Sequence, residues 1–323
     1  MLNEYLIRMD LPEDCIRVST REDGMYYRLF HYPVTDKMKN EIDCMQFPVL
    51  SANPIFYHEH TGGTETFLVS QGKFECYCMG RGFILQKGDI LHIQPWMGHS
   101  FTPVEPGSKL NIMFQGIDQQ NWITAPEYRL RANFPGVYED PDFQKFFNDH
   151  CQLINRAAPV PNMVERETVQ QLRMAGKGIR EHEFEGIKMH LKVARYETHG
   201  VKEIWDLFLK PGFYCEWDNF LPEYRVFYVT GGRIHCTVKT SFTTAVEFDA
   251  VEENIVFIPP YTPFRFDVVE EAHMYDLDCP ARLEDLCEEI KSYMHDNPGC
   301  GKDDKIMALC VQHGFNATDF GFK

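Results

Sequence analysis

The sequence predicts an all-β protein built from two antiparallel barrels, with a linker helix between them and helices at the C-terminal end. Three observations predict this fold. Short apolar runs bounded by Gly and Pro recur along the 323 residues, which favours many short strands over long helices. Two strand-rich stretches, 53–117 and 187–269, can be aligned with each other. Between and after them, apolar residues recur at helical spacing.

The expected domains follow the order of the chain. They are a first barrel, linker helices, a second barrel and a helical extension, over residues 1–138, 139–175, 176–280 and 281–323. In the linker, Pro141 follows Asp140 as a suitable N-cap, which predicts a helix that continues to about Arg156. A shorter helix is expected over 164–175. The length of the chain suits two medium-sized domains.

The composition narrows the class of protein. A net charge of −16 without a basic patch argues against nucleic acid and against an anionic membrane surface as partners. No run approaches the roughly 18 apolar residues that span a bilayer, and the segment before Pro12 lacks the apolar core of a signal peptide. The 11 cysteines follow no disulfide framework, which is typical of reduced thiols. We therefore expect a soluble, cytoplasmic protein.

Two histidines and a carboxylate form a metal-ligand pattern. Because side chains alternate along a strand, His58 and His60 share one face if this segment is a strand. The glycine pair at 62–63 predicts a turn that returns Glu65 on the neighbouring strand. His99 is a fourth candidate ligand. The spacing therefore predicts one metal site in the first barrel.

The two strand-rich stretches align on two anchors. Gly72 aligns with Gly231, and the segment Ile93–His99 aligns with Ile258–Phe264. The alignment pairs each candidate ligand with a different residue type: His58 with Trp217, His60 with Asn219, Glu65 with Tyr224, and His99 with Phe264. The second barrel should therefore bind no metal. It could serve as a scaffold, a dimerisation surface or an apolar small-molecule pocket.

These residues resemble the two sequence motifs of the cupin family. The matching positions are His58, His60, Glu65 and Gly72 in the first motif, and Gly88 and His99 in the second. The resemblance covers about 60 residues closely and the region 200–280 weakly. It implies a bicupin, which consists of two double-stranded β-helix barrels, and here only the first has the matching ligands. It also implies a homodimer.

Four positions depart from the cupin pattern. Ala52 stands where the first motif begins with Gly, and Pro95 lies one place beyond the proline of the second motif. Trp96 replaces a glycine of the second motif, and Pro103 replaces its closing Asn. These changes affect the shape of turns and leave the four ligands intact.

Three imidazoles and one carboxylate suit a single divalent transition metal, namely Fe, Mn, Ni, Co, Cu or Zn. Such an ion keeps coordination positions open for water or substrate. It could act as a Lewis acid or as an oxygen-activating centre. Candidates that line the substrate site are Phe101, Trp96, Asn111, Gln115 and His92. Trp96 is equally well a surface aromatic, whereas for His92 an ordinary partly buried histidine is favoured over a fifth ligand. No catalytic acid or base is assigned.

The motif identifies a fold better than a reaction, because cupins include enzymes of many classes and simple binding proteins. Three functions stay open. The first is a metal-dependent isomerase, epimerase or lyase acting on a small polar metabolite such as a sugar or carboxylate. The second is a dioxygenase of the quercetinase type. The third is a non-catalytic, metal-containing module that binds a small molecule.

Overall fold

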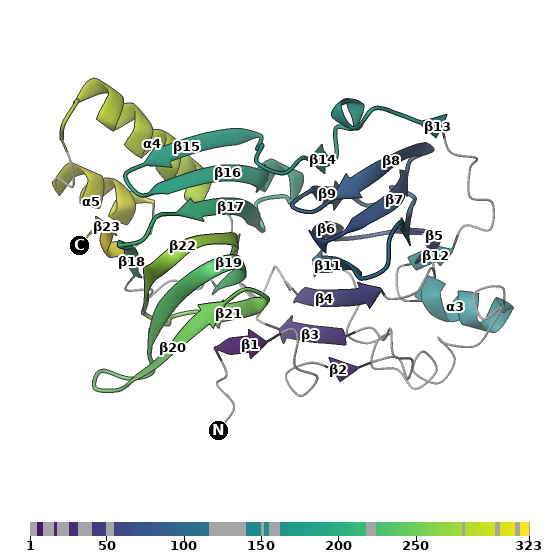
Figure 1. The fold of residues 1–323 in the computed structure, drawn as a ribbon, viewed down its shortest axis with the longest axis horizontal. Coiled ribbons are helices and arrows are strands. Elements are labelled where there is room, and N and C mark those ends of the chain that lie inside the picture. Colours follow the sequence, from purple (N-terminus) through teal and green to yellow (C-terminus); the bar gives the residue numbers. More distant parts are fainter. Residues whose placement is uncertain are drawn as a thin grey trace. The chain divides into compact units, whose positions relative to one another are not determined.

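The computed structural model describes the backbone of residues 5–8, 16–17, 26–31, 41–49, 55–115, 140–149, 152–154, 162–217, 224–279, 282–300, 304–313 and 317–322. Strands dominate these residues, and the predicted all-β class is confirmed (Figure 1). The chain divides into two compact units. The first unit holds the described residues of 11–31 and 40–175, and the second holds those of 1–10 and 176–323.

Two sheets make up the first unit. One has the order β14 (Leu172–Arg173), β9 (Ile90–Ile93), β6 (Thr64–Gln71), β11 (Ser108–Gln115), β4 (Glu41–Val49), β3 (Tyr26–His31), β2 (Ile16–Arg17). The other has the order β12 (Gln152–Ile154), β5 (Ile55–His60), β10 (His99–Pro103), β7 (Lys73–Cys78), β8 (Arg81–Gln86), β13 (Asn162–Met163). The sheets meet in an apolar core, where Phe67 of β6 contacts Phe101 of β10 with 4.2 Å between ring centroids. This arrangement is a jelly-roll sandwich.

The second unit is one long, folded sheet. Its main path runs β1 (Leu6–Arg8), β21 (Asn254–Ile258), β19 (Tyr224–Lys239), β22 (Phe264–Cys279), β17 (Glu203–Leu209), β16 (Ile187–Val193), β15 (Arg180–Phe184). Off this path, β20 (Ala245–Val251) pairs with β19, β18 (Phe213–Trp217) pairs with β22, and β23 (Ala317–Phe322) pairs with β18. Because β1 pairs with β21, the first described residues of the chain belong with its C-terminal strands.

The two longest strands, β19 and β22, change register where they bend. The irregularity lies between Val229 and Ile234, and Gly232 there has φ 74°. A Cβ atom at Gly232 would lie 1.9 Å from the carbonyl oxygen of Glu271, so the close approach requires glycine.

In the described part of the chain three helices accompany the sheets: α3 (Pro141–Asp149), α4 (Leu283–Asp296) and α5 (Asp304–Gln312). As predicted, Asp140 caps α3, because its Oδ1 accepts hydrogen bonds from the N–H groups of Asp142 and Phe143. None of the described helices is long and apolar enough to span a membrane.

Two expected helical segments of the linker are wrong. Helix α3 ends at Asp149, because residues 152–154 pair with β5 as strand β12. The expected helix over 164–175 is instead a 3₁₀ turn at Arg166–Thr168 followed by β14, which pairs with β9. A second 3₁₀ turn lies at Arg195–Glu197. In both segments, pairing with a neighbouring strand outweighs the helical pattern of the local sequence.

The strand registers confirm the internal repeat and correct its alignment. His58 lies opposite His99 in β5 and β10, and Trp217 lies opposite Phe264 in β18 and β22, as the alignment predicts. Along β6 and the turn at Gly72, however, the alignment is one residue off.

The correction concerns the position equivalent to Glu65. Glu65 pairs with Ile93, whereas the aligned Ile258 pairs with Arg225. Arg225, and not Tyr224, therefore occupies the position of Glu65 in the second unit. Likewise, Gly232 rather than Gly231 takes the positive φ that Gly72 has in the first unit.

Candidate metal centre

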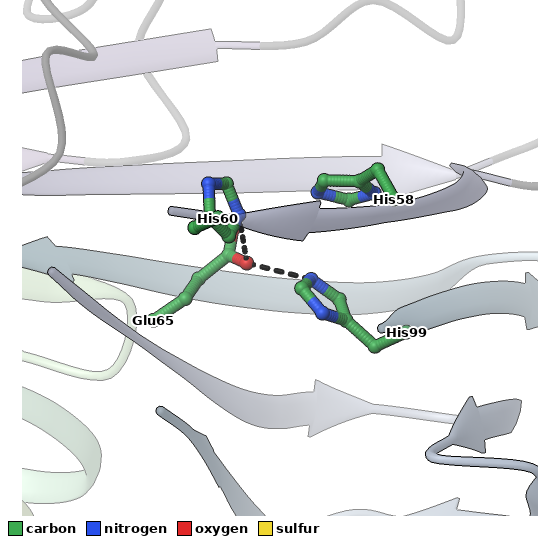
Figure 2. Close-up of side chains that lie close together, drawn as sticks. All are labelled: His58, His60, Glu65 and His99. Atoms are coloured by element: carbon green, nitrogen blue, oxygen red, sulfur yellow. Dashed lines mark hydrogen bonds and ion pairs between the residues drawn. The ribbon is translucent and has the colours of Figure 1, made fainter. Parts of the chain in front are cut away.

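Four side chains converge inside the first unit from three strands. His58 and His60 project from β5, Glu65 from β6 and His99 from β10 (Figure 2). All four are buried, and their potential ligand atoms lie within 4.8 Å of one another. The strand alternation and the turn at residues 61–63, where Gly63 has φ 74°, bring them together.

The contacts within this cluster match those of ligands around one ion. Glu65 Oε2 lies 2.9 Å from His60 Nε2 and 2.8 Å from His99 Nε2. Adjacent ligands on an octahedral ion with bonds of about 2.1 Å are about 3 Å apart. The ring of His58 is close as well, with its centroid 4.4 Å from that of His99. The cluster could therefore bind a metal.

The orientation of His99 is set by the backbone. Its Nδ1 lies 2.8 Å from the carbonyl oxygen of Met97, and a carbonyl only accepts, so Nδ1 carries the proton. The other nitrogen, Nε2, then faces Glu65 and the interior of the cluster. Such a second hydrogen bond is typical of metal-binding histidines, because it fixes the tautomer and the ring orientation.

Glu65 is held in its charged form. Burial acts to raise the pKa of this carboxyl group, but the charge of His60 and the close contacts with the His60 and His99 rings outweigh burial and hold the pKa well below its usual range. A buried carboxylate beside imidazoles is an anionic ligand that offsets part of the charge of a divalent cation.

Two of the candidates for the substrate site lie near the cluster in different ways. Phe101 is buried, and its ring centroid is 5.9 Å from that of His99. The side chain of Trp96 is exposed at the surface, and its backbone has φ 66°. The backbone N–H of Trp96 donates to the backbone carbonyl oxygen of His60 at 2.7 Å. The loop before β10 is thus tied to the strand that carries two ligands.

The structure places two of the other three candidates outside the cluster. The Nδ1 of His92 lies 2.9 Å from the hydroxyl of Thr66, whose neighbour Glu65 points to the opposite face of β6. Asn111 lies opposite Leu68, on that same outer face. The side chain of Gln115 lies outside the described part of the chain, as does Asn219 of the second unit.

Cys78 is a neighbour of the cluster that is not among the site residues predicted from the sequence. It is the cross-strand partner of His99, and burial raises the pKa of its thiol to about 12. The spacing of Cys76 and Cys78 predicts that they share one face of a strand. The sequence does not show that this strand pairs with β10. Seven cysteines have described side chains; all seven are free thiols, and six of them are buried.

Tyr57 packs against the loop beside the cluster. A Cβ atom at Gly98 would lie 2.2 Å from the hydroxyl oxygen of Tyr57. Gly98, the residue before His99, therefore makes room for this ring. No periodicity in the sequence indicates this contact.

Comparison with known proteins supports the fold. The sequence matches no protein-family model and no curated protein. The structure is similar to the 11S globulin from Wrightia tinctoria, described with an auxin binding site, at a TM-score of 0.54 and 11% identity, over 86% of this chain and 83% of that chain. It is also similar to oxalate decarboxylase from Bacillus subtilis, described with Mn(II) centres, at a TM-score of 0.50 and 14% identity, over 96% and 87%.

A further structure of oxalate decarboxylase gives a TM-score of 0.52 at 14% identity, over 96% of this chain and 87% of that one. Both kinds of protein are bicupins, and the likeness spans both units. The two-unit architecture, the aligned registers and these similarities agree. The chain therefore has the bicupin fold of the cupin superfamily.

Proposed function

We propose that this protein is a metal-dependent enzyme that acts on a small carboxylate by lyase-type chemistry. The observation that carries the proposal is the buried cluster of three imidazoles and one ionised carboxylate, His58, His60, Glu65 and His99. One divalent transition metal, held by these four side chains, would act as a Lewis acid toward the substrate.

The chain's own residues supply binding and exclusion of water. Four protein ligands leave two positions on an octahedral ion, which a carboxylate or a hydroxy-acid can occupy. Phe67 and Phe101 form an apolar wall beside His99, with ring centroids 5.5 and 5.9 Å from it. An apolar wall lowers the local dielectric and strengthens the attraction between the ion and an anionic substrate.

The structural neighbours favour a carboxylate over a sugar within this class. Oxalate decarboxylase, as its name states, removes carbon dioxide from a dicarboxylate, and the enzyme from Bacillus subtilis holds Mn(II). The similarity in sequence is low, so reaction type and metal are proposals that rest on the cluster itself. Isomerase and dioxygenase chemistry are the alternatives to be excluded by experiment.

A second candidate function is a metal-containing binding module. The described neighbours of the cluster that favour it are Phe67, Phe101 and the protonated thiol of Cys78. None of these three groups exchanges a proton readily at neutral pH, so they could shape a binding site without supplying an acid or a base.

The test begins with metal-free protein reconstituted separately with Mn, Fe, Co, Ni, Cu and Zn. Each form is incubated with a panel of small carboxylates, hydroxy-acids and sugars, while carbon dioxide release, oxygen uptake and substrate loss are followed. The proposal predicts carbon dioxide release or substrate cleavage without oxygen uptake. Oxygen uptake in proportion to turnover would establish a dioxygenase. Substrate binding without turnover in every metal form would establish the binding module.

Matched variants tie any activity to the cluster. His58→Ala removes a ligand, and His92→Gln removes an imidazole from the same unit on the other face of the sheet. Activity should disappear in the first variant and persist in the second.

A further inference from the structure

The second unit contains a cavity of about 80 Å³ between its strands and its C-terminal helices. Strands β16, β17, β18, β19 and β22 line it on one side, and α4 and α5 line it on the other. The lining is almost entirely apolar or aromatic, and includes Met189, Leu207, Phe213, Leu286 and Ile290. Three thiols, those of Cys215, Cys287 and Cys310, complete it.

This cavity occupies the position that the metal-ligand cluster has in the first unit. Trp217 lines the cavity and is the equivalent of His58. His58 pairs with His99 in the first unit, and Trp217 pairs with the aligned residue Phe264 in the second. Arg225 also lines it and is the equivalent of Glu65. The interior of the second barrel has therefore exchanged ligand atoms for apolar walls around an open volume.

The one charged pair in the cavity is internally neutral. Arg225 and Asp276 form a two-point ion pair, in which Arg225 Nε donates to Asp276 Oδ1 at 3.3 Å and a terminal nitrogen donates to Oδ2. The guanidinium also lies 5.2 Å from the ring of Trp217 and 5.4 Å from that of Phe227. A charged ligand would have to displace this pair or remain uncompensated, and both are costly in a buried site.

Water suits the cavity poorly. A buried water needs about 10–15 Å³ and two to four polar partners. The volume exceeds the need of a single water several-fold, but apart from the Arg225–Asp276 pair the lining offers apolar carbon and weakly polar thiols. An apolar occupant is therefore favoured over a water cluster.

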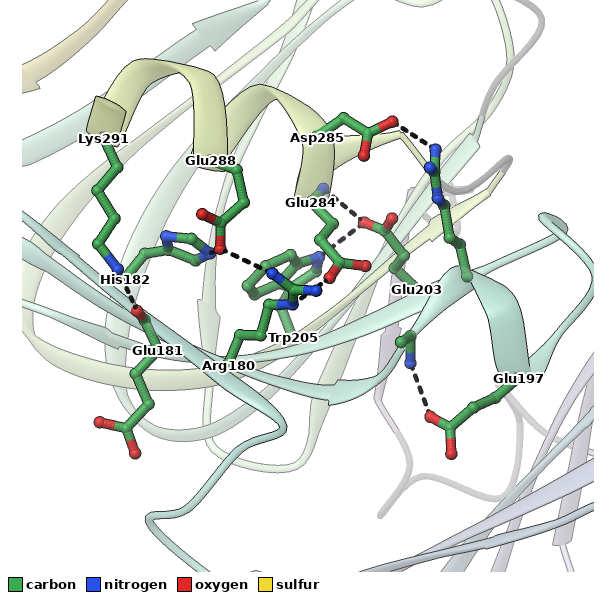
Figure 3. A network of polar contacts seen from close by, with 12 residues as sticks. Arg180, Glu181, His182, Glu197, Glu203, Trp205, Glu284, Asp285, Glu288 and Lys291 are labelled. Atoms are coloured by element: carbon green, nitrogen blue, oxygen red, sulfur yellow. Dashed lines mark hydrogen bonds and ion pairs between the residues drawn. The ribbon is translucent and has the colours of Figure 1, made fainter. Parts of the chain in front are cut away.

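Helix α4 covers the cavity and is fastened by polar contacts at its edge (Figure 3). The N–H of Glu284 donates to Glu203 Oε2 at 3.0 Å, and Arg180 Nε lies 2.8 Å from Glu284 Oε1. Further along the helix, Arg180 Nη1 lies 3.3 Å from Glu288 Oε1. Since Arg180 is half exposed, these ion pairs contribute little, and the apolar face of α4 mainly holds the helix over the cavity.

We propose that the second barrel is a separate binding site for a small, uncharged, apolar molecule no larger than about a six-membered ring. The site is distinct from the metal centre in position and in chemistry. Its ligand class follows from a small apolar volume whose one charged pair is already neutralised.

Benzene is a suitable uncharged probe, and benzoate is its charged counterpart. The test is titration of the full-length protein with each, followed by calorimetry and thermal unfolding. Cys310→Phe places a ring in the cavity. Val311→Phe adds the same ring on the exposed side of α5 as a matched control. Benzene should bind one per chain and raise the Tm of the wild type and of Val311→Phe. Cys310→Phe should bind at least about tenfold more weakly, and so should benzoate to the wild type.

Three results would overturn the proposal. They are the absence of benzene binding to the wild type at saturation, equal binding by a folded Cys310→Phe variant, and binding of benzoate as tight as that of benzene. If Cys310→Phe does not fold, crystals of the wild type under xenon decide the matter. Xenon density among Met189, Leu286 and Cys310 supports the site, and its absence there refutes it.

Discussion

His58 lies directly opposite His99 where strand β5 pairs with β10, and this register fixes the metal-ligand cluster. The second unit repeats the register with Trp217 opposite Phe264. One backbone arrangement thus presents imidazoles in one unit and large aromatic groups in the other. The difference between a site suited to metal and an apolar interior lies in the side chains alone.

The first prediction concerns metal content. Purified protein should carry about one divalent transition-metal ion per chain, measured by mass spectrometry of the metal. Loss of a residue that only hydrogen-bonds to a metal ligand lowers metal affinity about 10–100-fold. His58→Ala removes a ligand itself, so it should lower metal affinity by at least this factor. His92→Gln should keep the metal. Two ions per chain, or unchanged content in His58→Ala, would contradict the assignment.

The second prediction concerns stability. Because the metal binds the folded first unit and needs its assembled ligands, chelation should lower the Tm of that unit. At a free metal concentration 1,000 times Kd, the stabilisation is about 4 kcal/mol. Calorimetry with and without a chelator measures it. The His99→Ala variant, already without a complete site, should show little response, and an equal shift in that variant would indicate a non-specific effect of the chelator.

Much of the fold and the cluster could be predicted from the sequence because the signals are local. The spacing of His58 and His60 needs only strand alternation, and a glycine turn returns Glu65. His99 came from a motif of fixed length. These features do not depend on which distant strands pair.

Other features depend on tertiary pairing and could not be predicted. Strand β8 (Arg81–Gln86) has no clear signal of its own in the sequence, because it lies between two turns and its residues do not alternate cleanly. The inward or outward direction of His92 and Asn111 depends on the register of β9 and β11 with β6. The sequence also cannot decide whether Tyr224 or Arg225 is the equivalent of Glu65. Two strands can be aligned in either of two registers, and only their pairing partners show which one is correct.

The third prediction concerns pH. Burial, together with the nearby carboxylate of Asp278, raises the pKa of Glu203 to about 8, although hydrogen bonds from Trp205 and the N–H of Glu284 act in the opposite direction. The pKa of Asp278 is also raised by burial, to about 6. Carboxyl groups in unfolded chains titrate near 4. The folded state therefore binds protons more tightly, and this stabilisation is complete below about pH 4 and lost as pH rises to about 8.

The free energy of unfolding of the second unit should thus fall by more than about 1.4 kcal/mol between pH 5 and pH 9. Denaturant titrations across this range measure the slope. Glu203→Gln should flatten it, while Asp285→Asn, on the exposed side of α4, should leave it unchanged. A flat profile in the wild type would contradict the prediction and show that the buried pair is ionised throughout this range.

The fourth prediction separates two costs of replacing glycine. Gly80→Ala should cost about 1–2 kcal/mol, because its φ is 78° but a Cβ atom there meets nothing within 4 Å. Gly232→Ala should cost more than about 3 kcal/mol, because a Cβ atom would also collide with the backbone of Glu271 and Ala272. Urea unfolding gives both values. Equal losses would mean that the strands separate to accept the methyl group.

The fifth prediction tests whether Trp96 contacts the substrate. Trp96 and Tyr261 hold equivalent positions in the two units, with φ 66° and 60°, and both side chains are exposed. Non-glycine residues rarely adopt this conformation, because it costs free energy. Its presence at two equivalent positions indicates that the turn requires a positive φ there. The aromatic ring can therefore be tested separately from the backbone conformation. Asn tolerates a positive φ, so Trp96→Asn removes the ring and keeps the turn.

If Trp96 covers the substrate, Trp96→Asn should raise KM, or weaken ligand binding, by about tenfold, which is the worth of one buried aromatic contact of about 1.4 kcal/mol. Metal content and Tm should stay near those of the wild type, because the hydrogen bond from residue 96 to His60 belongs to the backbone. Tyr261→Asn is the matched control and should leave KM unchanged. Since both substitutions remove an exposed ring from the same kind of turn, equal effects on KM would assign them to loss of turn rigidity, and no effect of either would make Trp96 a surface residue.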